Sequence, residues 1–260
     1  MSTNVGKFNG KIALVTGASR GIGAEIAKKL AAGGAAFIGV HYASNREAAL
    51  KVVDDIEKLG SKAVALEADL TKGISGINQL WNSFEDAVRS EFGTMHVDIL
   101  VNNVGIAPGA LFEESSIEMF DDVVNVNLKA PYFLAQAASP FLREGGRIIN
   151  ISSGFTRVAA PMQAIYAAAK GAVETLTLAL APHFAPKGVT VNAVMPGVTA
   201  TDMNKDWRST PEGHAAAAGM SAFNRVGTTE DVADVVVFVA SEEARWVTGH
   251  VLDATGGARL

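Results

Sequence analysis

Short apolar runs alternate with longer amphipathic segments along the whole 260-residue chain. Several apolar runs are continuous, such as residues 99–101, which is typical of strands buried on both faces of a parallel sheet. The pattern predicts strands at residues 11–16, 36–42, 63–67, 98–102, 147–151, 190–195 and 250–253. Helical spacing of apolar residues predicts helices at residues 22–32, 46–59, 79–92, 116–142, 164–181 and 230–240. This alternation predicts a doubly wound α/β fold, and since no linker or repeat interrupts it, we expect one domain over residues 1–260.

Residues 198–223 form the least regular part of the pattern. They are rich in small and polar residues, and they include Pro211 and two isolated bulky side chains, Trp207 and Met220. Such a segment between a strand and the last helix is typical of a mobile flap over a ligand. A plain surface insertion is the alternative interpretation.

Composition and charge narrow the classes of protein. Hydrophobic residues make up 48% of the chain and charged residues 19%, which is enough for a large core. The net charge of −5 and the lack of a basic block argue against nucleic acid and anionic membranes as partners. There is no cysteine for disulfide or thiol chemistry. Residues 1–10 are polar and the apolar run at 31–40 is too short to span a bilayer, so we expect a cytoplasmic protein.

A glycine-rich turn follows the first predicted strand and opens the first predicted helix. It reads Thr-Gly-Ala-Ser-Arg-Gly-Ile-Gly over residues 16–23. Glycines let the backbone approach a pyrophosphate, and a helix N-terminus offers free N–H groups to it. A glycine-rich turn alone is weak evidence, but its position after the first strand predicts a dinucleotide site with contacts from Gly17, Ser19, Arg20, Gly21, Ile22 and Gly23.

The end of the second strand predicts which dinucleotide binds. An acid there would bind the ribose 2′-hydroxyl of NAD, but the chain has no acid near this turn until Glu47. A carboxylate about 4 Å from a phosphate costs roughly 4 kcal/mol at an effective dielectric of ~20. Its absence predicts NADP(H), with donors and contacts from Arg20, Tyr42, Ser44, Asn45 and Arg46. Arg46 as a plain surface residue at a helix start is the alternative.

Two further turns lie at the same predicted edge of the sheet. Asp69 and Leu70 follow the third strand, where Asp69 either accepts from the adenine amino group or caps the next helix. Asn103 and Gly105 belong to an Asn-Asn-Val-Gly turn after the fourth strand. Ligands of open α/β sheets bind at the carboxyl ends of the strands, so both turns are predicted to contact the cofactor.

Tyr166 and Lys170 are the candidate reacting groups. They are four residues apart in a predicted helix and so share one face. Ser153 lies just past the fifth strand and Asn127 follows the Asn-Asn-Val-Gly turn, which brings both to the same edge. Reduction of a ketone needs a proton donor at the carbonyl oxygen, and tyrosine has an ordinary pKa near ~10. An ammonium about 4 Å away supplies roughly the 3–4 kcal/mol needed to lower it, so we predict Tyr166 as general acid/base, Lys170 as the charge that lowers its pKa, and Ser153 as the hydroxyl that holds the substrate oxygen.

Pro131 follows Asn127 by four residues and has no N–H to donate. The Asn127 carbonyl therefore lacks its helical partner. We predict that it holds a water that passes protons to Lys170. An ordinary proline kink is the alternative.

Taken together, these motifs resemble the short-chain dehydrogenase/reductase family over nearly the whole chain. The resemblance covers the glycine turn, the Asn-Asn-Val-Gly turn (with Val104 in place of the family's alanine), and the interval of thirteen residues between Ser153 and Tyr166. It implies a catalytic tetrad of Asn127, Ser153, Tyr166 and Lys170, hydride transfer from a nicotinamide ring, and a seven-stranded parallel sheet in the order 3-2-1-4-5-6-7. It also implies a nicotinamide site at Pro196, Gly197, Val198 and Thr201, and a homotetramer or otherwise a homodimer.

The substrate is the least determined part of the prediction. We expect NADPH-dependent reduction of a ketone or aldehyde, or oxidation of a secondary alcohol, in a largely apolar pocket of Gly154, Phe155, Met162, Met203, Trp207 and Met220. The alternatives are 3-oxoacyl reduction for lipid assembly and a non-catalytic NADP(H)-binding protein. The five histidines lack metal-ligand spacing, so no metal is expected and they are interpreted as surface or packing residues. Pro182 and Pro186 are predicted to interrupt the helix that carries Tyr166.

Overall fold

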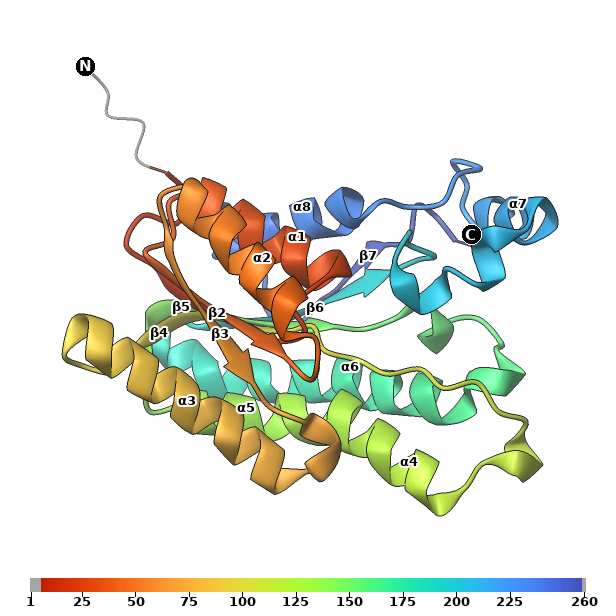
Figure 1. Cartoon of the computed structure of the whole chain (residues 1–260), viewed down its shortest axis with the longest axis horizontal. Coiled ribbons are helices and arrows are strands. Elements are labelled where there is room, and N and C mark those ends of the chain that lie inside the picture. Colours follow the sequence, from red (N-terminus) through yellow and green to blue (C-terminus); the bar gives the residue numbers. More distant parts are fainter. Residues whose placement is uncertain (1–5, 259–260) are drawn as a thin grey trace.

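Seven parallel strands form one sheet through the centre of the computed structural model, which describes residues 6–258 (Figure 1). Their order is β3-β2-β1-β4-β5-β6-β7, which confirms the order that the family resemblance implies. All seven predicted strands are present. Their bounds are Ile12–Val15 for β1, Phe37–Tyr42 for β2, Lys62–Glu67 for β3, Val97–Asn102 for β4, Leu142–Ile151 for β5, Thr190–Pro196 for β6 and Val251–Ala254 for β7.

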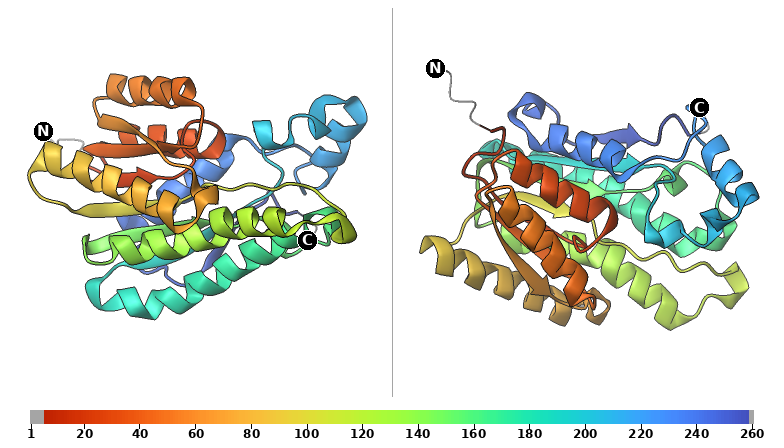
Figure 2. Two further views of the ribbon diagram at one scale, coloured as in Figure 1. Left: turned by 60° about the horizontal axis from the view of Figure 1, so that its bottom comes forward. Right: turned by 45° about the horizontal axis from the view of Figure 1, so that its top comes forward.

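Helices cover both faces of this sheet (Figures 1 and 2). One face carries α1 (Gly21–Ala32), α2 (Arg46–Lys58) and α8 (Thr229–Ala240), and the other carries α3 (Ile74–Phe92), α5 (Ala130–Ala138) and α6 (Ala164–Phe184). Each face has its own hydrophobic cluster. Every residue of β1, β2 and β4 is buried as a result, which is why apolar runs such as residues 12–15 and 99–101 are continuous.

The single helix predicted at 116–142 is wrong. The structure divides it into α4 (Ile117–Val124), a π-helical turn (Asn125–Lys129) and α5, and β5 already begins at Leu142. The apolar spacing continues through Phe141 and Leu142, although these residues belong to the turn and the strand. Pro140 cannot donate to a helix, and the helix ends before it.

Pro182 does not interrupt α6, contrary to the prediction. The helix includes Pro182 and continues to Phe184. Ala181 and Phe184 are both buried in the core on either side of the proline. Tertiary packing therefore carries the helix past the missing N–H, and Pro186 lies in the one-turn helix that follows.

The irregular segment at 198–223 contains a helix that the sequence pattern did not predict. It is α7 (Pro211–Gly219), and Thr210 caps it by accepting from the Gly213 N–H at 3.0 Å. A capping threonine followed by proline and glutamate is a recognised helix start, so the signal was present in the chain. The small side chains of α7 hid it from a search for apolar spacing.

One helical stretch among the described residues, Pro161–Lys187, is long and apolar enough to cross a membrane by length and composition. It consists of α6 and its flanking turns, and 33% of the residues in its most apolar window are buried. In this fold α6 packs along β6 and buries Tyr166 and Lys170 on its inner side. It is a covering layer of the sheet, and its length alone is weak evidence for a membrane span.

Candidate active site

The glycine turn after β1 has the backbone that its sequence predicts. Gly17 and Gly21 have φ angles of 62° and 59°, which side chains with a Cβ rarely adopt. Gly23 has a different role, because a Cβ there would lie 2.4 Å from both the Asn103 amide nitrogen and the Gly17 carbonyl oxygen. Gly23 thus lets α1 pack closely against the Asn-Asn-Val-Gly turn.

The buried side chain of His41 holds this turn by hydrogen bonds with the backbone. Its Nδ1 accepts from the Gly17 N–H at 2.9 Å, and its Nε2 donates to the Ala68 carbonyl at 3.0 Å. Burial lowers its pKa to about 4, so the ring is neutral. His41 is therefore the packing alternative of the prediction, and its two hydrogen bonds with the backbone were not predicted. A lone histidine inside an otherwise apolar strand was the available signal.

The end of β2 combines the predicted donors with one acid. The Tyr42 hydroxyl donates to Glu67 Oε2 at 3.0 Å, and burial together with Glu67 raises the pKa of Tyr42. Arg46 lies close enough to the Tyr42 hydroxyl to act against this rise. Parallel pairing places Glu67 of β3 beside Tyr42, so the statement that no acid lies near this turn holds only along the chain. Asn45 caps α2 by accepting from the Ala48 N–H at 3.0 Å.

Asp69 acts as a helix cap in the structure. It accepts from the Thr71 hydroxyl at 2.7 Å and the Thr71 N–H at 3.1 Å, and the hydroxyl in particular lowers its pKa. The capping alternative is thereby confirmed. The side chain of Leu70 is buried in the core, which leaves only its backbone for contact with a cofactor.

The four tetrad residues converge at the carboxyl edge of the sheet. Lys170 Nζ donates to the Ile151 carbonyl at 2.7 Å and lies 5.7 Å from the centre of the Tyr166 ring. A Cβ on Gly105 would lie 2.9 Å from Asn127 Oδ1 and 3.5 Å from Lys170 Nζ. Glycine at this position therefore keeps open the space between these two groups.

Burial dominates the electrostatics of the two reacting groups. It raises the pKa of Tyr166, while a hydrogen bond with the Ser153 hydroxyl acts in the opposite direction. Burial also lowers the pKa of Lys170 to about 8. The pKa of Tyr166 is thus raised in the protein by itself, and Lys170 is not among the groups that shift it. The predicted lowering of the Tyr166 pKa by Lys170 stays a prediction for the reacting complex.

Asn127 lies in a π-helical turn, which is more than an ordinary proline kink. The Ala130 N–H donates to the Asn125 carbonyl, and Pro131 follows in the first turn of α5. The Asn127 amide donates to the carbonyls of Ile106 and Val123 at 2.9 and 3.0 Å. The water between the Asn127 carbonyl and Lys170 stays a prediction.

The residues around this edge fit a dinucleotide. The N-terminus of α1 has no side-chain cap and no acid in its first turn, so its N–H groups are available to a phosphate. Thr201 lies beside the turn, since its Cγ2 would be 3.4 Å from a Cβ on Gly21. Gly197 permits close contact with the C-terminal segment, because a Cβ there would lie 2.6 Å from the Thr255 carbonyl oxygen.

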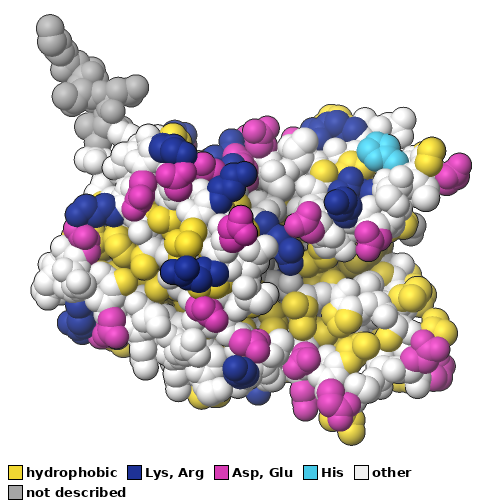
Figure 3. All heavy atoms as spheres, viewed as in Figure 1, with side chains coloured by type: hydrophobic (Ala, Val, Ile, Leu, Met, Phe, Trp, Pro, Cys, Tyr) yellow, Lys and Arg dark blue, Asp and Glu magenta, His cyan; other side chains and the backbone are white. Residues whose placement is uncertain are grey.

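Figure 3 shows apolar side chains around a hollow between α7 and α4 (Ile117–Val124) on the visible face. Phe155 packs edge-on against the Tyr166 ring with 6.3 Å between centres. The predicted pocket residues Met162, Met203 and Trp207 are 54%, 62% and 46% exposed, whereas Gly154 and Met220 are half-buried. Further exposed apolar residues lie in the segment 111–120 and at the end of the segment 198–223: Leu111, Phe112, Ile117, Phe120 and Phe223.

Within residues 6–258, no three histidine, aspartate or glutamate side chains are grouped closely enough to hold a metal ion. His214 is exposed on α7.

Comparison with known proteins assigns the family. Residues 17–259 match the family model adh_short_C2, described as enoyl-(acyl carrier protein) reductase. The chain is 40% identical to the versicolorin reductase of Emericella nidulans, with 97% of each protein covered. It is 41% identical to an uncharacterised oxidoreductase of Methylorubrum extorquens, covering 97% of this chain and 99% of that protein.

Solved structures give the same result. The angucycline C-6 ketoreductase LanV with bound NADP superimposes with a TM-score of 0.92 at 43% identity, covering 97% of this chain and 96% of LanV. The reductase LugOII, which catalyses keto-reduction at C1 in lugdunomycin biosynthesis, has a TM-score of 0.91 at 45% identity, covering 96% of this chain and 98% of LugOII. The chain belongs to the short-chain dehydrogenase/reductase family, as its motifs predict.

Proposed function

We propose that this protein is an NADPH-dependent ketoreductase whose substrate is a bulky, uncharged aromatic ketone. The observation that carries the proposal is the buried pair of Tyr166 and Lys170 with the half-buried Ser153 hydroxyl in hydrogen-bond contact with Tyr166. The names of the similar proteins support it, since versicolorin reductase, LanV and LugOII are all described as reductases.

The cofactor would lie along the carboxyl edge of the sheet. We assign its pyrophosphate to the turn at 17–23, its 2′-phosphate to Arg20, Ser44 and Arg46, and its nicotinamide end to residues 196–198 and Thr201. When bound, NADPH supplies the hydride that the carbonyl carbon receives. LanV was solved with NADP, which supports this choice.

The protein groups then handle the proton. Because burial raises the pKa of Tyr166, the phenol stays protonated at neutral pH and is ready to donate to a carbonyl oxygen. Ser153 holds the same oxygen with its hydroxyl. Lys170, with a pKa of about 8, is mostly charged at pH 7 and stabilises the phenolate that the transfer leaves behind. These protonation states favour reduction over oxidation near neutral pH.

A second candidate is reduction of a carrier-bound acyl chain, which the description of the matching family model favours. The border of the hollow argues against it. Glu113 and Glu114 lie next to the exposed Phe112, and Glu118 next to the exposed Ile117. An acyl chain on a phosphopantetheine arm brings a phosphate to this acidic border, where the two charges repel.

The test is a substrate panel with purified protein, followed by NADPH consumption. We expect turnover of fused-ring aromatic ketones to exceed that of 3-oxoacyl thioesters, and NADPH to be preferred to NADH. Faster turnover of carrier-bound 3-oxoacyl chains would replace the aromatic substrate by the second candidate. Tight NADPH binding without turnover of any ketone would favour a non-catalytic binding protein.

We also propose a homotetramer, or otherwise a homodimer, in the cytoplasm. Exposed apolar residues on two surfaces support assembly. On the surface of α5 and α6, Tyr132 and Leu178 are 45% and 63% exposed, and near β7, Trp246 is 96% exposed. Light scattering after size exclusion measures the assembly, and cell fractionation measures the location. A monomer would contradict the proposed assembly, and recovery with the membrane fraction would contradict the proposed location.

The segment 198–223 is proposed to close over the substrate as a flap.

A further inference from the structure

Glu174 joins the helix of the reacting groups to the segment that carries Ser153. It lies on α6, one turn after Lys170 and two turns after Tyr166, and so faces the same side. Its Oε1 accepts from the Ser152 hydroxyl at 2.5 Å and from the Thr156 hydroxyl at 2.9 Å. These two hydroxyls stand on either side of Ser153 in the chain. One carboxylate oxygen thus holds both ends of the segment 152–156.

The segment itself aims the Ser153 hydroxyl. The Phe155 N–H donates to Ser153 Oγ at 3.3 Å, and the Thr156 N–H donates to the Ser153 carbonyl at 3.0 Å. The Ser152 N–H donates to the Val194 carbonyl of β6 at 2.8 Å. With its oxygen already accepting from Phe155, Ser153 has its own proton to donate, to Tyr166 in this structure or to a substrate oxygen. Any shift of this short turn therefore moves the hydroxyl that meets Tyr166.

The half-buried carboxylate of Glu174 is not stabilised by a cation among the described residues. None of the ion pairs found within residues 6–258 includes Glu174. The residue is half-buried, and Ser152 is 2% exposed. A carboxylate that is partly removed from water without a cation is costly unless hydrogen bonds satisfy it. The two hydroxyls meet that need, which ties the carboxylate to the Ser153 segment.

We infer that Glu174 is a positioning residue that fixes the Ser153 hydroxyl against Tyr166. The inference rests on the proposed function in that Ser153 and Tyr166 are its reacting groups. The geometry has a direct electrostatic consequence. The Ser153 hydrogen bond is the contact that lowers the pKa of Tyr166 against the effect of burial. Releasing the segment therefore raises the pKa of the phenol further.

The first experiment compares Glu174→Leu with Glu174→Gln. Glutamine keeps an acceptor oxygen for both hydroxyls, whereas leucine keeps the bulk and loses the acceptor. We expect Glu174→Leu to lower kcat for the ketone by about 10- to 100-fold, the scale of a small misplacement of a reacting group. Glu174→Gln is expected to stay within about threefold of the parent protein. The Kd of NADPH is expected to change in neither variant, because Glu174 lies away from the glycine turn.

A pH profile separates positioning from simple loss of structure. In the direction of reduction, two groups lose a proton at high pH: Lys170, with a pKa of about 8, loses its charge first, and Tyr166 loses its proton at higher pH. Glu174→Leu is expected to move the Tyr166 limb of kcat to higher pH, and Glu174→Gln is expected to leave both limbs in place. A change in thermal stability alone would not move the Tyr166 limb. Loss of kcat in Glu174→Leu without such a shift would overturn the inference, as would parent-like kcat.

Two serines of the chain provide a matched control. Ser152→Ala removes a hydroxyl that donates to Glu174, whereas Ser75→Ala removes an exposed hydroxyl that donates to the Lys72 carbonyl at 3.0 Å. Only the first is expected to lower kcat. Equal effects of the two substitutions would overturn the inference.

Hydrogen exchange gives a readout without catalysis. We expect the amides of residues 153–156 to exchange faster in Glu174→Leu than in Glu174→Gln. This difference holds even if no ketone in the panel is turned over, so failure of the proposed function is distinguishable from failure of the inference. Equal exchange in the two variants would contradict the role of Glu174 in holding the segment.

Discussion

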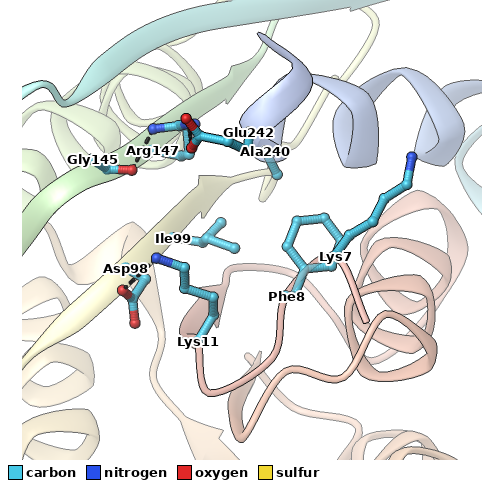
Figure 4. Close-up of a pocket in the computed structure, with 9 residues that line it drawn as sticks. All are labelled: Lys7, Phe8, Lys11, Asp98, Ile99, Gly145, Arg147, Ala240 and Glu242. Carbon is cyan, nitrogen blue, oxygen red and sulfur yellow. Dashed lines mark hydrogen bonds and ion pairs between the residues drawn. The ribbon is translucent and has the colours of Figure 1, made fainter. Parts of the chain in front are cut away.

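Both edges of the sheet bury charged side chains, but the groups that lie beside these charges differ between the two edges. At the amino edge, Asp98 is fully buried and accepts from Lys11 at 3.3 Å (Figure 4). It also accepts from the Ile12 N–H at 2.8 Å and from Arg143. At the carboxyl edge, Lys170 is 2% exposed and its ammonium has the Ile151 carbonyl at 2.7 Å as its hydrogen-bond acceptor. At the amino edge the buried carboxylate of Asp98 is paired with cations. At the carboxyl edge the buried ammonium of Lys170 has the dipole of the Ile151 carbonyl beside it.

Arg147 extends the contrast at the amino edge. It donates to the Ser241 and Gly146 carbonyls at 3.2 and 3.0 Å and to Glu242 at 3.2 Å, beside a cavity of about 40 Å³. These bonds join β5 to the end of α8. Removing one partner of a buried charge pair is destabilising because it leaves the other charge buried and unpaired, whereas a buried charge with no opposite charge beside it is a candidate for chemistry. The comparison predicts opposite consequences for substitutions at the two edges.

Tyr166→Phe is expected to have the largest effect. It removes the proton donor while keeping the ring that packs against Phe155. We expect kcat/KM for ketone reduction to fall by about 10²- to 10⁴-fold, with the Kd of NADPH unchanged. Steady-state NADPH oxidation measures the first quantity and fluorescence titration the second. Activity close to that of the parent protein would show that another group supplies the proton.

Asp98→Ala is expected to cause the largest loss of stability. It leaves the Ile12 N–H, Lys11 and Arg143 without their shared acceptor, and breaking a buried charged network of this kind costs about 3–5 kcal/mol. Urea unfolding at pH 7 measures the change. Asp54→Ala is the control, because Asp54 pairs with Lys58 on the surface and its loss costs under about 1 kcal/mol. Similar losses in the two variants would remove the distinction drawn for the amino edge.

Lys170→Met tests the other edge, where loss of a charge is expected to stabilise the protein. The pKa of Lys170 is lowered from 10.5 to about 8, so below about pH 8 the folded state holds a proton that burial makes unfavourable. Removing that cost gains about 3 kcal/mol, and losing the hydrogen bond to Ile151 takes back about 1 kcal/mol. The gain is expected to shrink as the pH rises from about 8 to 10.5, where the lysine is neutral in the folded state.

Urea unfolding at pH 7 and at about pH 10 measures this dependence, and the same variant is expected to lose ketone reduction. A variant that is less stable than the parent protein at pH 7 would mean that the site compensates the ammonium in some further way.

The sequence pattern predicts the sheet better than the contacts made across it. The central strands follow from apolar runs that only doubly covered strands tolerate, and the four tetrad positions follow from the motifs that the chain shares with its family. The rise in the Tyr166 pKa on burial was not predicted, because spacing along a helix reveals a shared face but not the depth of burial. Glu67 and Glu174 were missed for a related reason. Each acts on a residue of another strand or segment, and pairing between such segments is not visible in a local pattern.

The titration of His41 is expected to have the smallest effect on stability at neutral pH. Unlike the buried charges at the two edges, His41 is a buried group that stays neutral. Its pKa is lowered from 6.5 to about 4, so between these values the unfolded chain binds a proton that the folded protein does not. Stability therefore falls as the pH is lowered from about 6.5 towards 4, by about 1 kcal/mol at roughly pH 5.5. His41→Asn removes the titrating ring but keeps an acceptor for the Gly17 N–H, so we expect a flatter stability profile over this range and normal NADPH binding at pH 7. His41→Leu also flattens the profile, but it leaves the Gly17 N–H without its acceptor and is expected to weaken NADPH binding. An unchanged acid profile in both variants would assign the loss of stability to carboxylates elsewhere.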